Sequence, residues 1–347
     1  MTKVTAFNLR SAFPFGLSKA LLFFLFSFVL TSTPVKATEV AKQFYLLGSK
    51  ASMAGFVPPP GTYVGAINYY YTGDASGAAA NSVILDDVGK IDIEAQLNLD
   101  SRAFVLLPNA LWVAPNEILG GNLGLGGLLV LPGWQDTSAN IGVNASITLP
   151  DGTMFTAGDQ FRVRDKTTAA GDPILMALLG WHEGNWHWNV QALLNVPIGS
   201  YSVENISNIG FNRWALDLSA GATWLDPARG HEISAFGGFT FNGENPDTDY
   251  KTGTEFHIEF AAMQHFSQSI AFGLAGFHFQ QVTGDSGAGA TLGNFKGRAT
   301  ALGPNLSVNF ALGKIPVSTQ MHWYWEFNVK NRLKGSTGML TLTVPVL

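Results

Sequence analysis

Long runs of alternating apolar and polar residues constrain this sequence more than any other feature. In the run 212–224 the apolar positions are Trp214, Leu216, Leu218, Ala220, Ala222 and Trp224, and the positions between them include Arg213, Asp217 and Ser219. A period of two predicts a β-strand, because successive side chains of a strand point to opposite faces. Similar alternation runs through residues 91–99, 141–149, 186–196, 231–242, 255–266, 302–312 and 315–329. Almost nothing in the sequence predicts a long helix.

The length of these runs indicates strands that cross a membrane. Strands of soluble sheets usually have about five or six residues, whereas a tilted membrane strand needs about nine to eleven. Only 13% of the residues are charged, so the charged outer face that a soluble β-sandwich needs is missing. Trp181, Trp186 and Trp224 lie on apolar faces near strand ends, as in the aromatic girdles of membrane barrels. We therefore expect an all-β fold, a transmembrane antiparallel β-barrel, with a soluble sandwich as the alternative.

The runs predict about fourteen strands. We expect them near residues 61–73, 89–98, 102–113, 119–131, 139–150, 171–182, 185–197, 211–225, 229–242, 254–266, 269–282, 297–312, 315–329 and 338–347. The alternative is that 90–113 forms one long strand and residues 160–165 supply the fourteenth. Twelve strands is a further option. With both termini in the periplasm, the short connectors at 182–185, 226–229, 267–269 and 313–315 lie on that side. The long connectors at 74–88, 151–170, 198–210, 243–253, 283–296 and 330–337 would be extracellular.

The chain begins with the pattern of a cleaved export signal. Residues 1–37 hold four basic residues and no acidic residue, and the apolar run 20–30 is followed by Val35 and Ala37, which fit a cleavage site. A membrane anchor is the alternative, but eleven helical residues reach only about 16 Å of a hydrocarbon core of about 30 Å. We expect a signal peptide at 1–37, a plug or leader segment at 38–60 and the barrel at 61–347.

The segment 38–60 contains apolar side chains and ends in prolines that prevent strand formation. It ends in Pro58, Pro59 and Pro60, which cannot join a hydrogen-bonded ladder. An apolar segment at the mouth of a barrel avoids water by folding into the lumen, so we expect a plug, with a disordered leader as the alternative. The expected plug residues are Phe44, Tyr45, Leu47, Met53 and Phe56.

The polar positions of the alternating runs are candidates for the lumen wall. We expect the pore to be lined by His187, Gln191, Arg213, Asp217, Glu255, His257, Glu259, Asn309, Gln320, His322 and Glu326. Glu255, His257 and Glu259 share one strand face and could form a metal-binding patch, although any polar lumen needs such residues. Acidic residues in 242–250 and Asp285 could bind calcium, with solvated turns as the alternative. We expect no cofactor and no metal.

Several function classes do not fit the sequence. The chain has no cysteine, which removes disulfides, thiolate nucleophiles and iron–sulfur clusters. Beyond residue 37 the charge is strongly acidic and no Lys/Arg cluster occurs, so nucleic-acid binding is not expected. No GxSxG or HExxH motif accompanies the seven histidines, and we expect no enzymatic activity.

Several sequence blocks together resemble a known family. They include FYLLGSKASMAGFVPPPGTYV (44–64), WVAPNEILGGN (112–122), GDPILMALLGWHEGNWHWNVQALLNVPIGSY (171–201), FNGENPDTDYKTGTEFH (241–257), FQQVTGDSG (279–287), LGPNL (302–306) and WEFNVKNR (325–332). In this order they resemble the outer-membrane proteins named for the meta-pathway of phenol degradation. The resemblance covers nearly the whole mature chain. It implies a barrel in the outer membrane of a Gram-negative bacterium, a channel or transporter often associated with catabolism of aromatic compounds.

Two functions of different classes are expected. The first is a channel for passive uptake of small hydrophobic or aromatic solutes, and the second is a non-transporting structural or adhesion barrel that works through its extracellular loops. The expected partners are the lipid bilayer, the outer-membrane assembly machinery and the solute.

Overall fold

The computed structural model describes residues 43–85, 89–290 and 296–346, and the expected signal peptide lies outside them. Sixteen strands lie within these ranges. They are β1 (Gly61–Leu85), β2 (Gly89–Val113), β3 (Asn122–Leu128), β4 (Gly133–Thr148), β5 (Met154–Ala169), β6 (Ile174–Glu183), β7 (Trp186–Asn195), β8 (Ala215–Asp226), β9 (His231–Asn242), β10 (Glu244–Asn245), β11 (Tyr250–Lys251), β12 (Glu255–His265), β13 (Ile270–Gln281), β14 (Arg298–Leu312), β15 (Ile315–Lys330) and β16 (Lys334–Val346). In the described part of the chain, no helix is long and apolar enough to cross a membrane.

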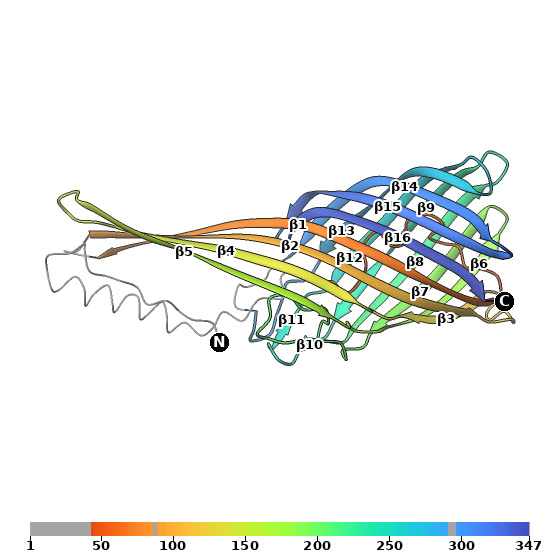
Figure 1. Ribbon diagram of the computed structural model, residues 1–347, viewed down its shortest axis with the longest axis horizontal. Coiled ribbons are helices and arrows are strands. Elements are labelled where there is room, and N and C mark those ends of the chain that lie inside the picture. The colour runs from red at the N-terminus through yellow and green to blue at the C-terminus, as the bar shows by residue number, and fades with distance from the viewer. Residues whose placement is uncertain (1–42, 86–88, 291–295, 347) are drawn as a thin grey trace. The chain divides into compact units, whose positions relative to one another are not determined.

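Twelve strands close into an antiparallel barrel (Figure 1). Their order around the wall is β1-β16-β15-β14-β13-β12-β9-β8-β7-β6-β3-β2, and β2 pairs again with β1. Closure leaves no free sheet edge around the wall, so the backbone groups of the wall are satisfied within the sheet, as lipid requires. The all-β barrel expected from the sequence is confirmed.

Two further strands, β4 and β5, extend the sheet beyond the closed barrel. Residues 109–113 of β2 pair with β3, whereas residues 90–105 pair with β4, which pairs in turn with β5. The pairing of β1 with β16 ends at Asp74, but its pairing with β2 continues to Leu85. The four strands β1, β2, β4 and β5 therefore form a sheet that we call the extension (Figure 1).

The extension corrects two expectations. Residues 89–98 and 102–113 are one strand, as in the alternative given above, because Asp100 pairs with Asp74 and Ser138 at the expected break. Residues 74–85 and 154–169 are strands instead of extracellular loops. The first eleven residues of β5 are exposed on both faces, so burial did not impose an apolar alternation there.

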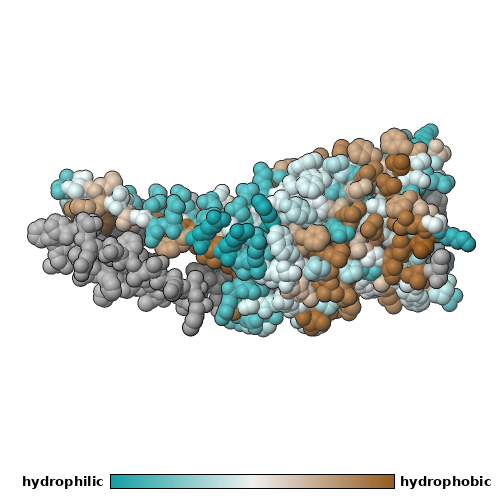
Figure 2. All heavy atoms as spheres, in the orientation of Figure 1, coloured by the Kyte–Doolittle hydropathy of each residue, from teal (hydrophilic) through white to brown (hydrophobic). Residues whose placement is uncertain are grey.

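In the barrel wall, polar side chains are buried and apolar side chains are exposed, the reverse of a soluble protein. Along β8, Asp217, Ser219 and Thr223 are buried, whereas Leu216 and Leu218 are exposed. Figure 2 shows apolar residues gathered on the outside of the barrel. The polar face is thus enclosed in the lumen, and the apolar face meets the hydrocarbon of the membrane.

The short turns lie at one end of the barrel, together with the first and last wall residues. Thr62 of β1 pairs with Val346 of β16, and the β6–β7, β8–β9, β12–β13 and β14–β15 turns share that end. We call it the periplasmic end, because short turns lie on that side in outer-membrane barrels. The extension lies at the opposite, extracellular end.

Candidate functional site

The segment 43–60 lies against the inner face of the barrel wall. Its side chains Phe44, Tyr45, Leu47 and Val57 are buried, and the first three join an apolar cluster with wall residues such as Phe277. Met53 is half-buried with a positive φ of 56°, and Phe56 is 38% exposed. Four of the five expected plug residues are therefore wholly or partly enclosed, and Phe56 lies at the rim.

Two buried carboxylates of the wall bind the backbone of this segment. Glu259 on β12 accepts hydrogen bonds from the Gly48 and Lys50 amides at 2.9 and 2.7 Å. Glu232 on β9 accepts one from the Met53 amide at 2.6 Å and another from the Ser52 hydroxyl at 3.0 Å. A carboxylate that accepts two hydrogen bonds at once is a strong anchor, because charge-assisted bonds are about twice as strong as neutral ones.

Further hydrogen bonds follow the segment along its length. The Gly55 amide donates to Thr223 Oγ1 at 3.0 Å, and Asn189 Nδ2 donates to the Ala54 carbonyl at 2.9 Å. The Tyr324 hydroxyl donates to the Gly48 carbonyl at 3.2 Å. These partners come from β7, β8 and β15, so the segment is fixed to strands on several sides of the lumen.

An aromatic and ionic cluster holds Tyr45 in the lumen. The Tyr45 ring stacks on His257 with 3.6 Å between centroids, and His257 Nε2 lies 2.9 Å from Asp217 Oδ2. Asp217 also accepts hydrogen bonds from Thr240 and Ser219. The alternation of β8 and β12 brings these groups together, because Asp217 and His257 both face inward and β9 lies between their strands.

The lumen wall has a polar part and an apolar part. The polar wall, on β8, β9 and β12, presents Asp217, Ser219, Thr223, Glu232, Ser234, Thr240, Glu255, His257 and Glu259. The apolar wall, on β1, β2 and β6, presents Tyr63, Ile67, Tyr69, Leu107, Leu111, Met176 and Leu178. The carboxylates that bind residues 43–60 belong to the polar wall, whereas Tyr63, Ile67, Tyr69 and Leu111 are only half-buried.

The structure places the remaining expected pore residues at different depths. Glu326 accepts hydrogen bonds from the Tyr71 hydroxyl and the Gly335 amide, and it lies 3.6 Å from Arg332 Nη2. Gln191, Arg213, Glu255 and His322 are buried, whereas His187 and Gln320 are half-buried. Asn309 does not join them, because it is exposed and donates to the Gln268 carbonyl near the periplasmic turn.

Sequence reasoning missed several lumen residues. Glu232 and Ser234 alternate with Ile233 in the run 231–242, so their polar face could have been assigned from the pattern already identified. Tyr324 shares the face of His322 and Glu326 in the run 315–329, so the period of two places it inward as well. Phe277 could not be assigned, because an inward aromatic side chain departs from the polar lumen face expected of a strand.

Two groups of residues were candidates for metal or calcium sites. Among residues 43–85, 89–290 and 296–346, no group of three or more His, Asp or Glu side chains could hold a metal ion. Asp285, named above as a candidate calcium ligand, accepts hydrogen bonds from Tyr250, the Gly253 amide and Gln281.

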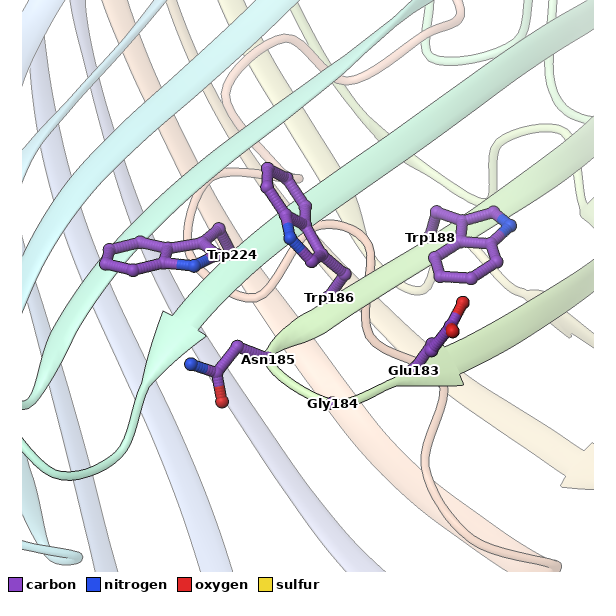
Figure 3. A pocket seen from close by; sticks show the side chains of 6 residues that line it. All are labelled: Glu183, Gly184, Asn185, Trp186, Trp188 and Trp224. Carbon is purple, nitrogen blue, oxygen red and sulfur yellow. The ribbon is translucent and has the colours of Figure 1, made fainter.

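The outer wall carries an open aromatic pocket near the β6–β7 turn. Trp186, Trp188 and Trp224 line it together with Glu183 and Asn185 (Figure 3). The tryptophans alternate with inward residues of β7 and β8, so this pocket belongs to the membrane-facing surface. Its place at the periplasmic end fits the aromatic girdle expected for Trp186 and Trp224.

One solved structure shows the same fold, and others match with lower TM-scores. An outer membrane channel from Pseudomonas putida F1 superposes with a TM-score of 0.54 at 15% identity, covering 86% of this chain and 99% of that one. A FadL homologue from Pseudomonas aeruginosa matches with a TM-score of 0.37 at 10% identity, covering 82% and 89%. The CymD monoaromatic hydrocarbon channel matches with a TM-score of 0.32 at 9% identity, covering 83% and 88%.

A sequence comparison that covers most of the chain shows its family. A comparison with curated proteins finds no match. The closed barrel with its apolar outer surface is that of a protein of the Gram-negative outer membrane. A family model described as "Putative MetA-pathway of phenol degradation" matches residues 64–342, and the chain belongs to this family.

Proposed function

We propose that this protein is an outer-membrane channel through which small hydrophobic or aromatic solutes pass without energy input, and that residues 38–60 act as its plug. The observation that carries the proposal is the division of the lumen. The plug is hydrogen-bonded to the polar wall through Glu232 and Glu259. On the apolar wall, Val57 of the plug joins a cluster with Leu178, while Ile67 and Tyr69 stay half-buried.

The apolar wall supplies the chemistry that such solutes need. Tyr63 and Tyr69 offer ring faces, and Ile67 and Leu111 offer aliphatic surface. Aromatic pairs prefer offset or edge-to-face contacts of modest strength, which favour passage over tight binding. A sugar would find few hydrogen-bond partners on this wall, so the path would discriminate between aromatic and sugar solutes.

The likeness to channels supports transport over catalysis. The P. putida protein with the same fold is called an outer membrane channel. The buried His257–Asp217 pair is covered by the Tyr45 ring, so it has no open face toward a substrate. We therefore assign no enzymatic activity, and the assembly machinery of the outer membrane remains an expected partner.

Removal of the plug tests the proposal. Deleting residues 39–57 from the mature chain should raise single-channel conductance in planar bilayers and weaken discrimination between aromatic and sugar solutes in liposome flux. A double variant, Glu232→Gln with Glu259→Gln, should act in the same direction, because it weakens the anchors and keeps every residue of the plug. Unchanged conductance in both folded variants would contradict the plug.

The extension favours a second candidate function. Its strand β5 has an outer edge without a neighbouring strand in the described sheet, and its side chains are largely exposed, which suits contact with a partner outside the cell. Absence of flux in the intact and in the plug-deleted protein would favour this structural or adhesion role over the channel.

A further inference from the structure

Two histidines face each other across the β6–β7 hairpin at the periplasmic mouth of the lumen. His182 and His187 are register partners, and their Nδ1 atoms lie 2.7 Å apart. Both face inward, because their neighbours Trp181 and Trp188 stack on the outer surface with 6.4 Å between ring centroids. The turn Gly184–Asn185 closes the hairpin directly below them, which fixes the separation of the two strands.

We propose that His182 and His187 form a binding site for one divalent transition-metal ion, of the class that imidazole prefers, such as Zn²⁺, Cu²⁺ or Ni²⁺. Neutral imidazole nitrogens bind such ions at about 2.0–2.1 Å, so two of them on one ion lie about 2.9–3.4 Å apart. The two Nδ1 atoms need to separate by only a few tenths of an ångström, which rotation of two rim side chains supplies without backbone movement.

The surroundings suit an exchangeable ion. His182 is exposed and His187 is half-buried, so solvent reaches the pair. No third His, Asp or Glu of the described residues joins them in a metal-binding group, so water completes the coordination. Such a site, with coordination positions left to water, resembles an open metal site more than a structural site in which protein side chains supply every ligand.

The site also touches the plug. The Phe56 ring lies 5.1 Å from the His182 ring and 5.2 Å from the His187 ring, measured between centroids. Next to it, the Gly55 amide is bonded to Thr223 and Val57 is buried. An ion that reorients the two imidazole rings therefore changes the packing of Phe56, the last aromatic residue of the plug. This consequence rests on the proposed channel function, whereas metal binding itself does not.

Metal titration of the tag-free mature protein in detergent tests the site. Calorimetry should give one Cu²⁺, Zn²⁺ or Ni²⁺ per chain, with Cu²⁺ bound tightest, and no binding of Mg²⁺, which prefers oxygen ligands. Electron paramagnetic resonance of the Cu²⁺ form should show two coordinating imidazole nitrogens. His182→Asn and His187→Asn should each weaken binding at least tenfold.

Two histidines elsewhere provide the controls. His231 is an exposed histidine at the start of β9, and His231→Asn should leave the titration unchanged. His265 lies 2.7 Å from Glu232, so His265→Asn tests whether that pair is the binding site instead. Absence of binding, equal binding in His182→Asn and wild type, or loss of binding only in His265→Asn would each overturn the proposal.

Conductance separates this proposal from the channel function. Zn²⁺ added on the periplasmic side should change the single-channel current of the wild type, and Phe56→Leu should retain metal binding while losing that change. If metal binds at the pair but neither the intact nor the plug-deleted protein conducts, the site stands and the channel function fails.

Discussion

Glycine at position 55 lets the plug approach the backbone of the wall. A Cβ atom there would lie 2.3 Å from the His187 carbonyl oxygen, 2.6 Å from the Thr223 nitrogen and 2.7 Å from the Ala222 Cα. All three atoms belong to the backbone of paired strands, which cannot shift cheaply. The contact between plug and wall therefore depends on the lack of a side chain at Gly55 as much as on the hydrogen bonds around it.

Gly55→Ala should displace the plug and leave the barrel folded. The added methyl group forces residue 55 away from Thr223 and breaks its hydrogen bond, so single-channel conductance should rise. Gly142→Ala is the matched control, because its nearest atoms lie 4.0 Å away on the extension. Equal conductance in the two variants would show that the segment does not restrict the path.

An arginine at Leu218 should destabilise the barrel far more than one at Val163. Leu218 and Val163 are 48% and 47% exposed, but only Leu218 lies on the lipid-facing wall. Arginine at the bilayer midplane costs about 2–4 kcal/mol, whereas exposed surface changes cost within about 0.5 kcal/mol. Denaturant unfolding in lipid vesicles measures the free energy of unfolding of both variants. Similar losses of stability in the two would mean that β5 is also in the membrane.

The sequence predicted the residues of the wall better than their partners. The alternation at Asp217, His257 and Glu259 set their inward direction, because the period of a strand is a local property. It did not predict that Glu259 would bind the Gly48 and Lys50 amides, because that contact joins residues 211 and 209 positions apart. Such pairings depend on where the closed barrel places an otherwise unpaired segment.

At the scale of elements, the extension is held by cross-strand polar pairs. Arg164 on β5 donates to both carboxylate oxygens of Asp136 on β4, at 2.9 and 2.6 Å. This hydrogen bonding holds the pKa of the Asp136 carboxyl below its ordinary value. The Ser101 and Thr137 hydroxyls lie 3.0 Å apart across β2 and β4. Farther from the barrel the two faces differ, because Leu97, Ile141 and Phe161 pair on one face and Gln96, Gly142 and Gln160 pair on the other.

Single cysteines should locate the extension outside the cell. Because the chain has no natural cysteine, Ala157→Cys on β5 and Ala228→Cys in the β8–β9 turn each introduce one unique thiol. A membrane-impermeant maleimide added to intact cells should label position 157 and spare position 228. Lysed cells supply the control in which both react, and the reverse pattern in intact cells would invert the assigned topology.

The strands of the wall were easier to predict than the extension. Lipid on one side and a polar lumen on the other enforce the alternation seen in β8, whereas residues 154–164 of β5 are exposed on both faces and alternate only in part. The sequence left open whether 90–113 is one strand or two, and pairing of the polar triplet Asp100–Arg102 with β1 and β4 keeps it extended. The number of strands thus depends on pairing between distant segments.

At the scale of the whole molecule, closure of the barrel predicts a heat-modifiable β-sheet protein. Unheated protein in SDS should migrate differently from heated protein, because the closed sheet resists the detergent until it is unfolded. Circular dichroism should show mainly β-structure, and fractionation should recover the protein with the outer membrane. A helical spectrum or a soluble periplasmic fraction would contradict the fold.

The long sequence separation between the plug and its anchors also orders the steps of folding. Its partners Glu232, Glu259 and Tyr324 lie 180, 211 and 276 residues away along the chain. Closure of the wall itself joins Thr62 to Val346, and the plug has all of these partners together only once β9, β12 and β15 are in place. Although residues 43–60 leave the ribosome first among the described residues, we therefore expect them to become native last. In refolding from urea into detergent, the quenching of introduced fluorophores at the plug should lag behind recovery of the β-sheet signal.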